Sequence, residues 1–505
     1  MNFVNPSQTK KVKEIENSEN QLELLNIKRY NLNMKKQTYR RIRDPIHGLI
    51  DFSEREQQLI DTKVFQRLRR IRQLAMVFLV YPSALHTRFD HSIGVMHIAG
   101  RICTSLQELS PDGISDEDIA NVRFAALLHD IGHGPFSHLS ENLLEKFSPA
   151  QTNMGIARGR VHEKITIDII RNDSQIKDIL DDKERKFLID MIQGKPTRDW
   201  RRDVISSELD ADKMDYLLRD SYFAGVKYGE YDLEKLIESC LVVDRPKTQL
   251  ARPETQLALN SEGLYALEQF MLARYHMKQQ VYSHEVSLIS DEMIIRGITL
   301  AIEEGNKQIA KLYKYPRRNK KDTDQDYEKK RKDFVQNYLN YHDEKVIDLL
   351  RNCKQRKANK IFNRLYNREL FNTITGLRFK YEDMAIRDCL QEMVADSDRK
   401  RRCEKKIAEC IGPNADADYI IVNKPAVRNL NYDSQSKTQS SEAVMIFDEN
   451  NKKQDRLEAL GEYAGELFLA RYYDGASPLE IVQVYAPYQV SEKKERKIQD
   501  ILRSS

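Results

Sequence analysis

The stretch FAALLHDIGHGPFSHLSE, residues 124–141, decides the fold at the centre of this chain. Its apolar residues recur every three or four positions up to Leu128, which predicts a buried helix. Gly132 and the pair Gly134-Pro135 follow, so we expect the helix to end near His129. Three histidines and two acidic residues lie in the same stretch. The segment therefore joins a helix terminus to side chains that bind metals and transfer protons.

Histidines of the whole chain are concentrated around this stretch. The chain has 11 histidines, and seven of them lie between residues 86 and 162. Imidazole is a common metal ligand and the usual acid or base near neutral pH, so this region is where we expect the chemistry. The seven residues are His86, His91, His97, His129, His133, His138 and His162.

Composition excludes several classes of protein. The 505 residues include 82 Lys and Arg and 78 Asp and Glu, and a net charge of +4 argues against a dedicated nucleic-acid coat. The longest apolar stretch, Leu74–Tyr81, is too short to span a bilayer, and the first residues lack the apolar core of a signal peptide. Six cysteines without C-x-x-C spacing argue against disulfides and cysteine zinc sites. We therefore expect a cytoplasmic protein without a membrane partner.

Patterning along the chain predicts a mainly helical fold with four parts. Residues 1–36 are polar and poorly periodic, which is typical of a flexible arm. Residues 37–305 form the expected core, residues 306–378 a charged helical segment, and residues 379–505 a smaller α/β lobe.

Local patterns define the elements within these parts. Alternation around a proline and a glycine in TYRRIRDPIHGLIDF, residues 38–52, predicts a hairpin. Helical spacing of apolar residues then continues from Ser53 to about Leu300. The lobe contains the short β-like runs ADYIIV, AVMIF and EIVQVY, separated by polar loops.

Three segments supply residues that are typical of a metal site. His91 lies in RFDHSIGVMHIAG, His129 and Asp130 lie in the stretch quoted first, and Asp212 lies in LDADKMDYLLRD. Two imidazoles and two carboxylates suit Mn, Fe, Zn or Mg and leave coordination positions open for water or phosphate. Adjacent side chains diverge on a regular helix, so His129 and Asp130 reach one ion only if the helix ends there.

The second carboxylate of this set has a competitor, because Asp210 precedes Asp212 by two residues. Composition alone does not separate the two. Asp212, Tyr216 and Asp220 are spaced i, i+4 and i+8, so on a helix they share one face and line one wall of a pocket.

The chain resembles the HD-domain metal-dependent phosphohydrolases, and within them the deoxynucleoside triphosphate (dNTP) triphosphohydrolases. This branch includes the vertebrate enzyme with a sterile alpha motif, a domain that we do not expect here. The short H…HD…D pattern alone is shared with phosphodiesterases and alarmone hydrolases. The resemblance covers roughly residues 39–300 and runs through RIRDPIHG, FQRLRRIRQL, YPSALHTRFDHSIGVMHIAG, LLHDIGHGPFSH and DADKMDYLLRDSYFAGV.

This resemblance implies an HD core, a regulatory or oligomerising C-terminal lobe, and a role for individual residues. It selects Asp212 over Asp210. The implied ligands of one divalent ion are His91, His129, Asp130 and Asp212. The implied phosphate-binding residues, acting on a nucleotide that carries Mg²⁺, are Arg88, Lys213 and Arg274. The implied contacts to the rest of the nucleotide are Gln73, Leu74, Tyr216, Asp220 and Tyr282.

The implied reaction cleaves a dNTP to a deoxynucleoside and inorganic triphosphate. The leaving 5′-oxygen needs a proton, and the implied donor is His138, supported by Glu141 and His162 with His133 nearby. Glu141 stands where close relatives have Asp. Lys278 stands where the vertebrate enzyme has His, so the resemblance does not imply the preferred dNTP.

The resemblance also implies regulation. Asp61 and Arg69 match positions that read a guanine in the activating nucleotide site of tetrameric relatives, so GTP or a dNTP is the implied activator of a homotetramer. A carboxylate can accept from guanine N1–H and N2–H, and an arginine can donate to O6 and N7. The same segment is also an amphipathic helix with a charged outer face, and this second interpretation stays open.

Two other functions stay open at this point. A phosphodiesterase acting on a cyclic or linear nucleotide shares the HDIG motif, although the distal G-Y-P signature of that group is absent. A nucleotide-responsive scaffold that binds single-stranded nucleic acid would use the densely charged, mainly basic residues 311–333. A solvated helix or loop explains the same charges.

Overall fold

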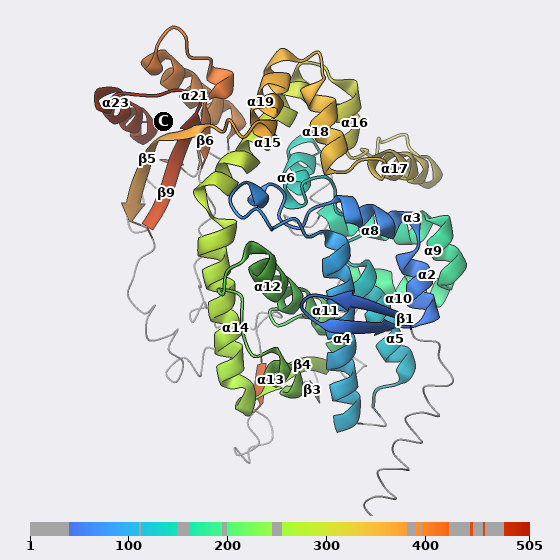
Figure 1. The fold of residues 1–505 in the computed structure, drawn as a ribbon. Coiled ribbons are helices and arrows are strands. Elements are labelled where there is room, and N and C mark those ends of the chain that lie inside the picture. Colours follow the sequence, from blue (N-terminus) through green and yellow to red (C-terminus); the bar gives the residue numbers. More distant parts are fainter. Residues whose placement is uncertain are drawn as a thin grey trace, which may run out of the picture. The chain divides into compact units, whose positions relative to one another are not determined.

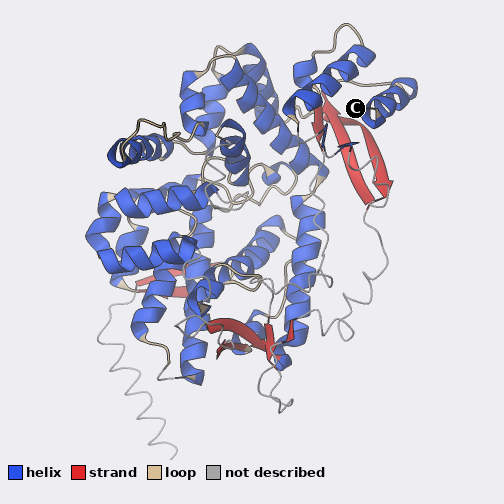
Figure 2. Cartoon of the chain, turned by 180° about the vertical axis from the view of Figure 1, so that it is seen from behind, coloured by secondary structure: helices blue, strands red, loops and turns tan. Residues whose placement is uncertain are grey.

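A computed structural model describes residues 40–110, 113–148, 161–193, 199–244, 255–380, 389–390, 392–393, 396–423, 445–447, 458–459 and 479–504. Helices dominate, and strands are gathered into small sheets (Figure 2). This confirms the expected fold class, a helical core with a small α/β part. The expected arm over residues 1–36 lies outside the described residues. The chain divides into two compact units, Met1–Thr62 and Lys63–Ser505.

The described part of the first unit is a hairpin followed by a helix. Strand β1 (Arg40–Asp44) pairs antiparallel with β2 (Gly48–Phe52), which confirms the predicted hairpin. The Asp44 carboxylate closes the turn by accepting the backbone N–H groups of Ile46 and His47 at 2.8 and 3.0 Å. Helix α2 (Glu54–Ile60) begins with a capping box between Ser53 and Glu56.

Three helices of the second unit carry or adjoin the implied metal ligands. Helix α4 (Arg88–Leu109) packs against α5 (Asp116–Leu128) and α12 (Ala211–Ala224) (Figure 1). Capping boxes begin α4 at Thr87 and α5 at Ser115. Helix α5 ends at Leu128, and His129 is its C-terminal cap. The predicted helix terminus is therefore confirmed.

Shorter helices surround these three. Before α4 lie α3 (Lys63–Gln66) and the 3₁₀ turns η1 (Arg67–Arg70) and η2 (Val77–Leu79). Between α5 and α12 lie α6 (His138–Phe147), α8 (Val161–Asn172), α9 (Ser174–Ile179), α10 (Asp182–Gln193) and α11 (Trp200–Ile205). After α12 follow α13 (Leu233–Glu238), η3 (Ser261–Gly263), α14 (Leu264–Met277), the π-helical turn η4 (Lys278–Tyr282) and α15 (Glu285–Glu303).

The charged region predicted over residues 306–378 contains α16 (Lys307–Tyr313), α17 (Asp324–Tyr338), α18 (Asp343–Arg351) and α19 (Arg356–Tyr366). Most side chains of α17 are exposed, as a solvated helix requires. Arg331 is an exception, because it donates to the buried carboxylate of Asp168 at 2.7 Å. That ion pair holds α17 against α8.

The helical prediction for residues 53–300 is wrong at two strands. Strand β3 (Cys240–Asp244) pairs antiparallel with β4 (Thr255–Asn260), because short apolar runs also suit a sheet, and Cys240, Leu257 and Leu259 are buried there. The sheet continues in the order β3–β4–β7–β8, with β7 (Met445–Phe447) parallel to β4 and β8 (Glu458–Ala459) beside β7. The described part of the predicted run AVMIF, Met445–Phe447, is thus a strand, but it joins a sheet that begins in the core.

The remaining C-terminal elements form a sheet in the order β5–β9–β6, made of β5 (Asn372–Lys380), β9 (Leu479–Ala486) and β6 (Ile421–Asn423). Helices α21 (Ser397–Ile411) and α23 (Glu492–Arg503) pack on it, and η5 (Ala417–Tyr419) leads into β6 (Figure 1). Apolar side chains such as Ile407, Val484 and Leu502 form a buried core there. An α/β part therefore exists where the pattern predicted one.

Disulfides and membrane spans were two features that the composition argued against. All six cysteines lie among the described residues, and each is a free thiol. Every helix in the described ranges is too short or too polar to cross a membrane.

Candidate active site

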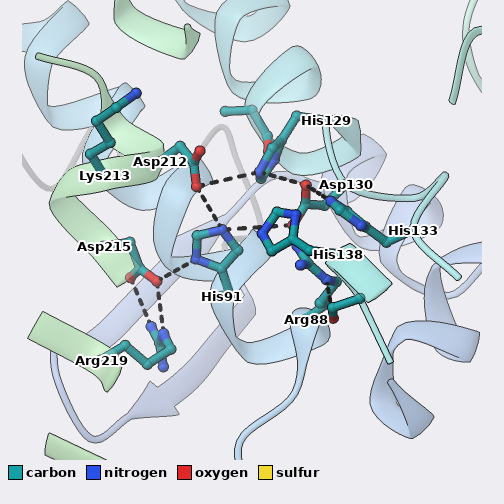
Figure 3. A network of polar contacts seen from close by, with 12 residues as sticks. Arg88, His91, His129, Asp130, His133, His138, Asp212, Lys213, Asp215 and Arg219 are labelled. Carbon is teal, nitrogen blue, oxygen red and sulfur yellow. Dashed lines mark hydrogen bonds and ion pairs between the residues drawn. The ribbon is translucent and has the colours of Figure 1, made fainter. Parts of the chain in front are cut away.

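The four implied metal ligands converge in the structure (Figure 3). His91 comes from the first turn of α4, His129 and Asp130 follow α5, and Asp212 lies in the first turn of α12. Asp212 Oδ1 lies 3.0 Å from His91 Nε2 and 3.8 Å from His129 Nε2. Asp130 Oδ1 lies 3.2 Å from His129 Nε2, and Asp130 Oδ2 lies 3.8 Å from His91 Nε2. His91, His129 and Asp212 are thus close enough to share one cation, and Asp130 lies beside His129.

Hydrogen bonding prepares both imidazoles for a metal. His91 Nδ1 lies 2.9 Å from Asp215 Oδ2, and His129 Nδ1 lies 2.7 Å from the carbonyl oxygen of Ala126. A carbonyl oxygen or a carboxylate accepts only if Nδ1 carries the proton, which leaves the lone pair on Nε2. Both Nε2 atoms are buried without a hydrogen-bond partner. The residues therefore fit a divalent ion, which would satisfy these two atoms.

A buried ion pair behind His91 holds the ring in place. Asp215 accepts from Arg219 through two hydrogen bonds of 2.8 and 2.9 Å, and both side chains are fully buried. Gly94 permits this arrangement, because a Cβ at that position would lie 1.9 Å from Asp215 Oδ1. Sequence reasoning missed Asp215 and Arg219. The signal for them was present, since acid and base at i and i+4 on the Asp212 helix form an ion pair on one face.

Charges within the cluster shift the pKa values of its members. Burial lowers the pKa of His91, but the carboxylates of Asp212 and Asp215 outweigh it and raise that pKa to about 10. Burial raises the pKa of Asp130, yet the charges of Arg88 and His129 hold it well below its usual range. The pKa of Asp212 is likewise lowered despite burial, mainly by His91. Both carboxylates are thus ionised at neutral pH, and a bound cation would displace the extra proton on His91.

The structure also separates Asp212 from its competitor Asp210. Asp210 is the N-terminal cap of α12 and accepts the backbone N–H of Lys213 at 2.7 Å and that of Ser207 at 3.0 Å. Its carboxylate also pairs with the Lys213 ammonium at 2.7 Å. Asp210 therefore holds the helix start, while Asp212 faces the histidines.

A second cluster contains the implied proton donor. His138 begins α6, and its side chain is 73 % exposed. Its Nδ1 lies 2.8 Å from Glu141 Oε1, and His162 Nδ1 lies 2.9 Å from Glu141 Oε2. His133 stacks on His162 with ring centroids 4.0 Å apart, and His133 Nε2 lies 3.3 Å from Asp130 Oδ1. This second cluster is thus connected to the metal ligands through His133.

Electrostatics in the second cluster favour a charged pair. Burial raises the pKa of Glu141, but His162 and His138 outweigh it and hold that pKa well below its usual range. Burial lowers the pKa of His162, yet the Glu141 carboxylate raises it to about 9. The pKa of His133 is lowered by burial and by the charges of Arg88 and His162. The ionised Glu141 thus holds the Nδ1 atoms of both His138 and His162 with its two carboxylate oxygens.

The three implied phosphate-binding cations lie in different surroundings. Arg88 is buried and donates to Asp130 and to Ser137 Oγ, while its Nη2 has no hydrogen-bond partner. Lys213 donates to Asp210 and, at 2.7 Å, to the carbonyl oxygen of Ser207. Arg274, from α14, pairs with Glu208 at 2.5 Å. Each cation is held by an acidic partner close to the chain segments that carry the metal ligands.

The residues implied to contact the nucleoside meet around Asp220. His86 Nε2 lies 2.7 Å from Asp220 Oδ1, and the Tyr282 hydroxyl donates to Asp220 Oδ2 at 2.6 Å. The rings of Tyr216 and Tyr282 meet edge to face at 6.3 Å, so Tyr216 and Asp220 share the predicted face of α12. The Gln73 backbone N–H donates to the carbonyl oxygen of His86 at 3.1 Å. Sequence reasoning assigned no role to His86.

The remaining residues discussed in the sequence analysis are Gln73, Leu74 and Lys278. Leu74 is half-buried, and Gln73 Oε1 is buried without a hydrogen-bond partner. Lys278 begins the π-helical turn that ends at Tyr282. Such turns frequently mark functional sites.

The two residues implied in regulation lie in different compact units. Asp61 is the C-terminal cap of α2, and its carboxylate accepts from Gln57 Nε2 at 3.2 Å. Arg69 lies in η1, donates to Gln66 Oε1 at 2.9 Å, and covers the ring of Phe89 at 3.4 Å. Both interactions also suit ordinary surface charges.

Comparison with known protein families identifies this arrangement. Residues 88–220, which include all four converging ligands, match the model of the HD domain family. This segment is an HD domain. Residues 243–321 and 323–460 match the model of the HD associated region. The matched segment thus contains α4, α5 and α12 and the side chains on which the resemblance rested.

Similar proteins extend beyond the HD domain itself. An uncharacterized protein of Methanocaldococcus jannaschii is 36 % identical over 271 residues, which cover 54 % of this chain and 52 % of that protein. A deoxynucleoside triphosphate triphosphohydrolase SAMHD1 homolog of Dictyostelium discoideum is 33 % identical over 269 residues, or 52 % of this chain and 49 % of that protein. The human deoxynucleoside triphosphate triphosphohydrolase SAMHD1 is 28 % identical over 283 residues, or 51 % and 44 %.

These similarities match the dNTP triphosphohydrolase resemblance found in the sequence and support a phosphohydrolase. The aligned region spans about half the length of the curated relatives. HD domains bind a divalent metal, and the clusters of His and Asp described above can hold one.

Proposed function

We propose that this chain is a metal-dependent dNTP triphosphohydrolase. The observation that carries this proposal is the convergence of His91, His129 and Asp212, with Asp130 beside them and two buried imidazole nitrogens that lack a partner. A bound Mn, Fe, Zn or Mg ion would polarise a phosphoryl oxygen and activate water at these residues. The names of the dNTP triphosphohydrolases among the relatives support the same chemistry.

The flanking residues suit a triphosphate and its leaving group. Arg88, Lys213 and Arg274 supply positive charge for phosphate oxygens, and Mg²⁺ is the usual companion of a nucleotide. Protonated His138 donates from Nε2 to the departing 5′-oxygen, because its Nδ1 is held by Glu141. His162 supports that pair, because its Nδ1 is hydrogen-bonded to the other oxygen of the Glu141 carboxylate.

The Asp220 cluster suits the deoxyribose. The Asp220 carboxylate can accept from a 3′-hydroxyl, with Gln73 as a second polar partner. The side chains that would pack against C2′ are those of Tyr282 and Leu74, and Tyr216 lies beside Tyr282. A ribose 2′-hydroxyl would clash with them sterically. The preferred base is left open.

Product analysis tests the proposal. Incubation with each dNTP and Mn²⁺ or Mg²⁺, resolved by anion exchange, is expected to yield deoxynucleoside and triphosphate only. In H₂¹⁸O the label is expected in triphosphate and not in the deoxynucleoside, because water attacks the α-phosphorus. Initial release of dNMP and pyrophosphate would contradict the proposal. Hydrolysis of a cyclic or linear dinucleotide, with dNTPs untouched, would assign the phosphodiesterase alternative instead.

We also propose that a nucleotide activates the enzyme by assembling it. Asp61 and Arg69 have the functional groups that read a guanine, and GTP or a dNTP is the activator we propose. A ligand that binds only an assembled form shifts the equilibrium towards it by mass action. A homotetramer is the assembly we propose, with the C-terminal α/β part as its regulatory element.

Sedimentation velocity with and without GTP or mixed dNTPs tests this assembly. We expect a larger particle and sigmoidal kinetics with the nucleotide, and a right-shifted activation curve for Asp61→Ala with unchanged metal content. Lys63→Ala, which alters a charge just beyond α2, serves as the matched surface control. An unchanged particle size with hyperbolic kinetics in all three proteins would leave Asp61 and Arg69 as surface charges.

A further inference from the structure

The loop between the metal ligands and His138 has an unusual backbone. Phe136 and Ser137 both have positive φ angles, of 64° and 55°, although neither is glycine. Each such residue costs roughly 1–3 kcal/mol and persists only where surrounding contacts enforce it. His138 follows at once as the first residue of α6. The direction of the His138 side chain therefore depends on what holds this loop.

A carboxylate from a distant part of the chain holds it. Asp343, the first residue of α18, is buried, and its Oδ1 accepts the backbone N–H of Phe136 at 2.8 Å. Its Oδ2 accepts the backbone N–H of Arg72 at 3.0 Å. Burial raises the pKa of Asp343 to about 6, so at neutral pH it is ionised and both oxygens accept. One side chain thus ties the loop to the segment that carries Gln73.

Further hydrogen bonds hold the same loop in place. Ser137 Oγ donates to the carbonyl oxygen of Arg72 at 2.7 Å and accepts from Arg88 Nε at 2.8 Å. Arg67 donates to the carbonyl oxygens of His133 and Tyr341 at 2.9 and 3.0 Å. Asp343 therefore contacts the loop directly at Phe136, and Arg67 links Tyr341 to the loop at His133.

We propose that Asp343 is a positioning residue that aims His138 at the leaving group. The inference rests on the proposed function, and it adds a residue outside the 88–220 segment that matches the HD domain. A carboxylate suits this place because two backbone N–H groups converge on it from different segments. Asparagine offers one accepting oxygen and turns an NH₂ donor towards the other N–H, so one hydrogen bond is lost.

Asp343→Asn is expected to lower kcat for dNTPs by about 10- to 100-fold, the size of a small misplacement of a catalytic group. KM and metal content are expected to stay within about twofold, since neither the ligands nor the phosphate-binding cations change. Hydrolysis of bis(p-nitrophenyl) phosphate, whose leaving group needs no proton, is expected to change little. Equal losses on both substrates would contradict a role that acts through His138.

A double-mutant cycle gives the sharpest test. In a His138→Ala background, Asp343→Asn is expected to cause less than about a threefold further loss, because the group that it positions is absent. Additive losses would overturn the proposal. Glu404→Gln is the matched control, because Glu404 is also buried and accepts the backbone N–H of Val422 at 3.3 Å, far along the chain from the loop. We expect it to lower Tm without changing kcat.

A spectroscopic readout keeps this inference separate from the proposed function. With ¹³C-labelled histidine, the ring signal of His138 is expected to shift or double in Asp343→Asn and to stay unchanged in Glu404→Gln. This comparison needs no substrate, so it stands even if dNTPs prove not to be hydrolysed. Should Asp343→Asn fail to fold, Asp343→Glu keeps the charge while moving the oxygens, and an intermediate loss of kcat is expected. Wild-type kcat and an unchanged His138 signal would overturn the proposal.

Discussion

Replacing His129 and Asp130 together by alanine is expected to abolish bound metal and turnover at once. The pair supplies two of the four proposed ligands, and it follows the end of α5 rather than lying within the helix. His91 and Asp212 alone form an incomplete set with no neighbour to fix the ion. Metal content by mass spectrometry and dNTP hydrolysis, measured on the same preparation, should fall together to background.

A matched control accompanies this variant. His97 belongs to the same histidine-rich region and lies on α4, but it is not among the residues that converge on the site. His97→Ala is expected to retain metal and turnover. Circular dichroism should show that the His129→Ala/Asp130→Ala protein keeps its helices. Full metal content in that folded double variant would remove the ligand assignment.

His138→Ala is expected to reduce kcat by about 10²–10⁴-fold while metal stays bound, the usual range for a positioned general acid. The exposed ring of His138 contacts Glu141 rather than the metal ligands, so its loss leaves the cation in place. The defect should be largest for a dNTP, whose 5′-alkoxide is a poor leaving group. It should be small for bis(p-nitrophenyl) phosphate.

The second cluster offers an internal comparison for this prediction. Glu141→Gln keeps the shape of the side chain but removes the carboxylate charge that lies beside His138 Nδ1. It should therefore lower kcat in the same direction, by less than His138→Ala. A His138→Ala protein that loses metal, or that loses both substrates equally, would assign His138 a structural role.

Local sequence pattern was sufficient for the part of the site that depends on short-range rules. The apolar period up to Leu128, and the glycines and proline beyond it, predicted a helix end at His129, which is where α5 ends. The spacing of Asp212, Tyr216 and Asp220 predicted a shared helix face, and Tyr282 meets two of them there. Such rules involve neighbours within about two helical turns, so the residue order alone determines them.

Longer-range pairing could not be predicted in this way. Sequence reasoning extended the helical core through β3 and β4, because short apolar runs suit a helix or a strand equally. It also placed AVMIF in a separate lobe, whereas β7 pairs in parallel with β4. Which strand completes a sheet depends on partners nearly two hundred positions away, and local periodicity carries no signal for them.

The sequence by itself predicted the place of the site, because clustered histidines and acids and the pattern of a helix end are visible in the residue order, and the resemblance implied the ligands. Only the tertiary structure determined which contacts orient those side chains. The Asp215–Arg219 pair behind His91 needs the close approach of α12 to α4 at Gly94. The clamp of Asp343 on Phe136 joins residues 207 positions apart. Such contacts arise from packing of whole elements, which bring hydrogen-bond partners together irrespective of their distance in the chain.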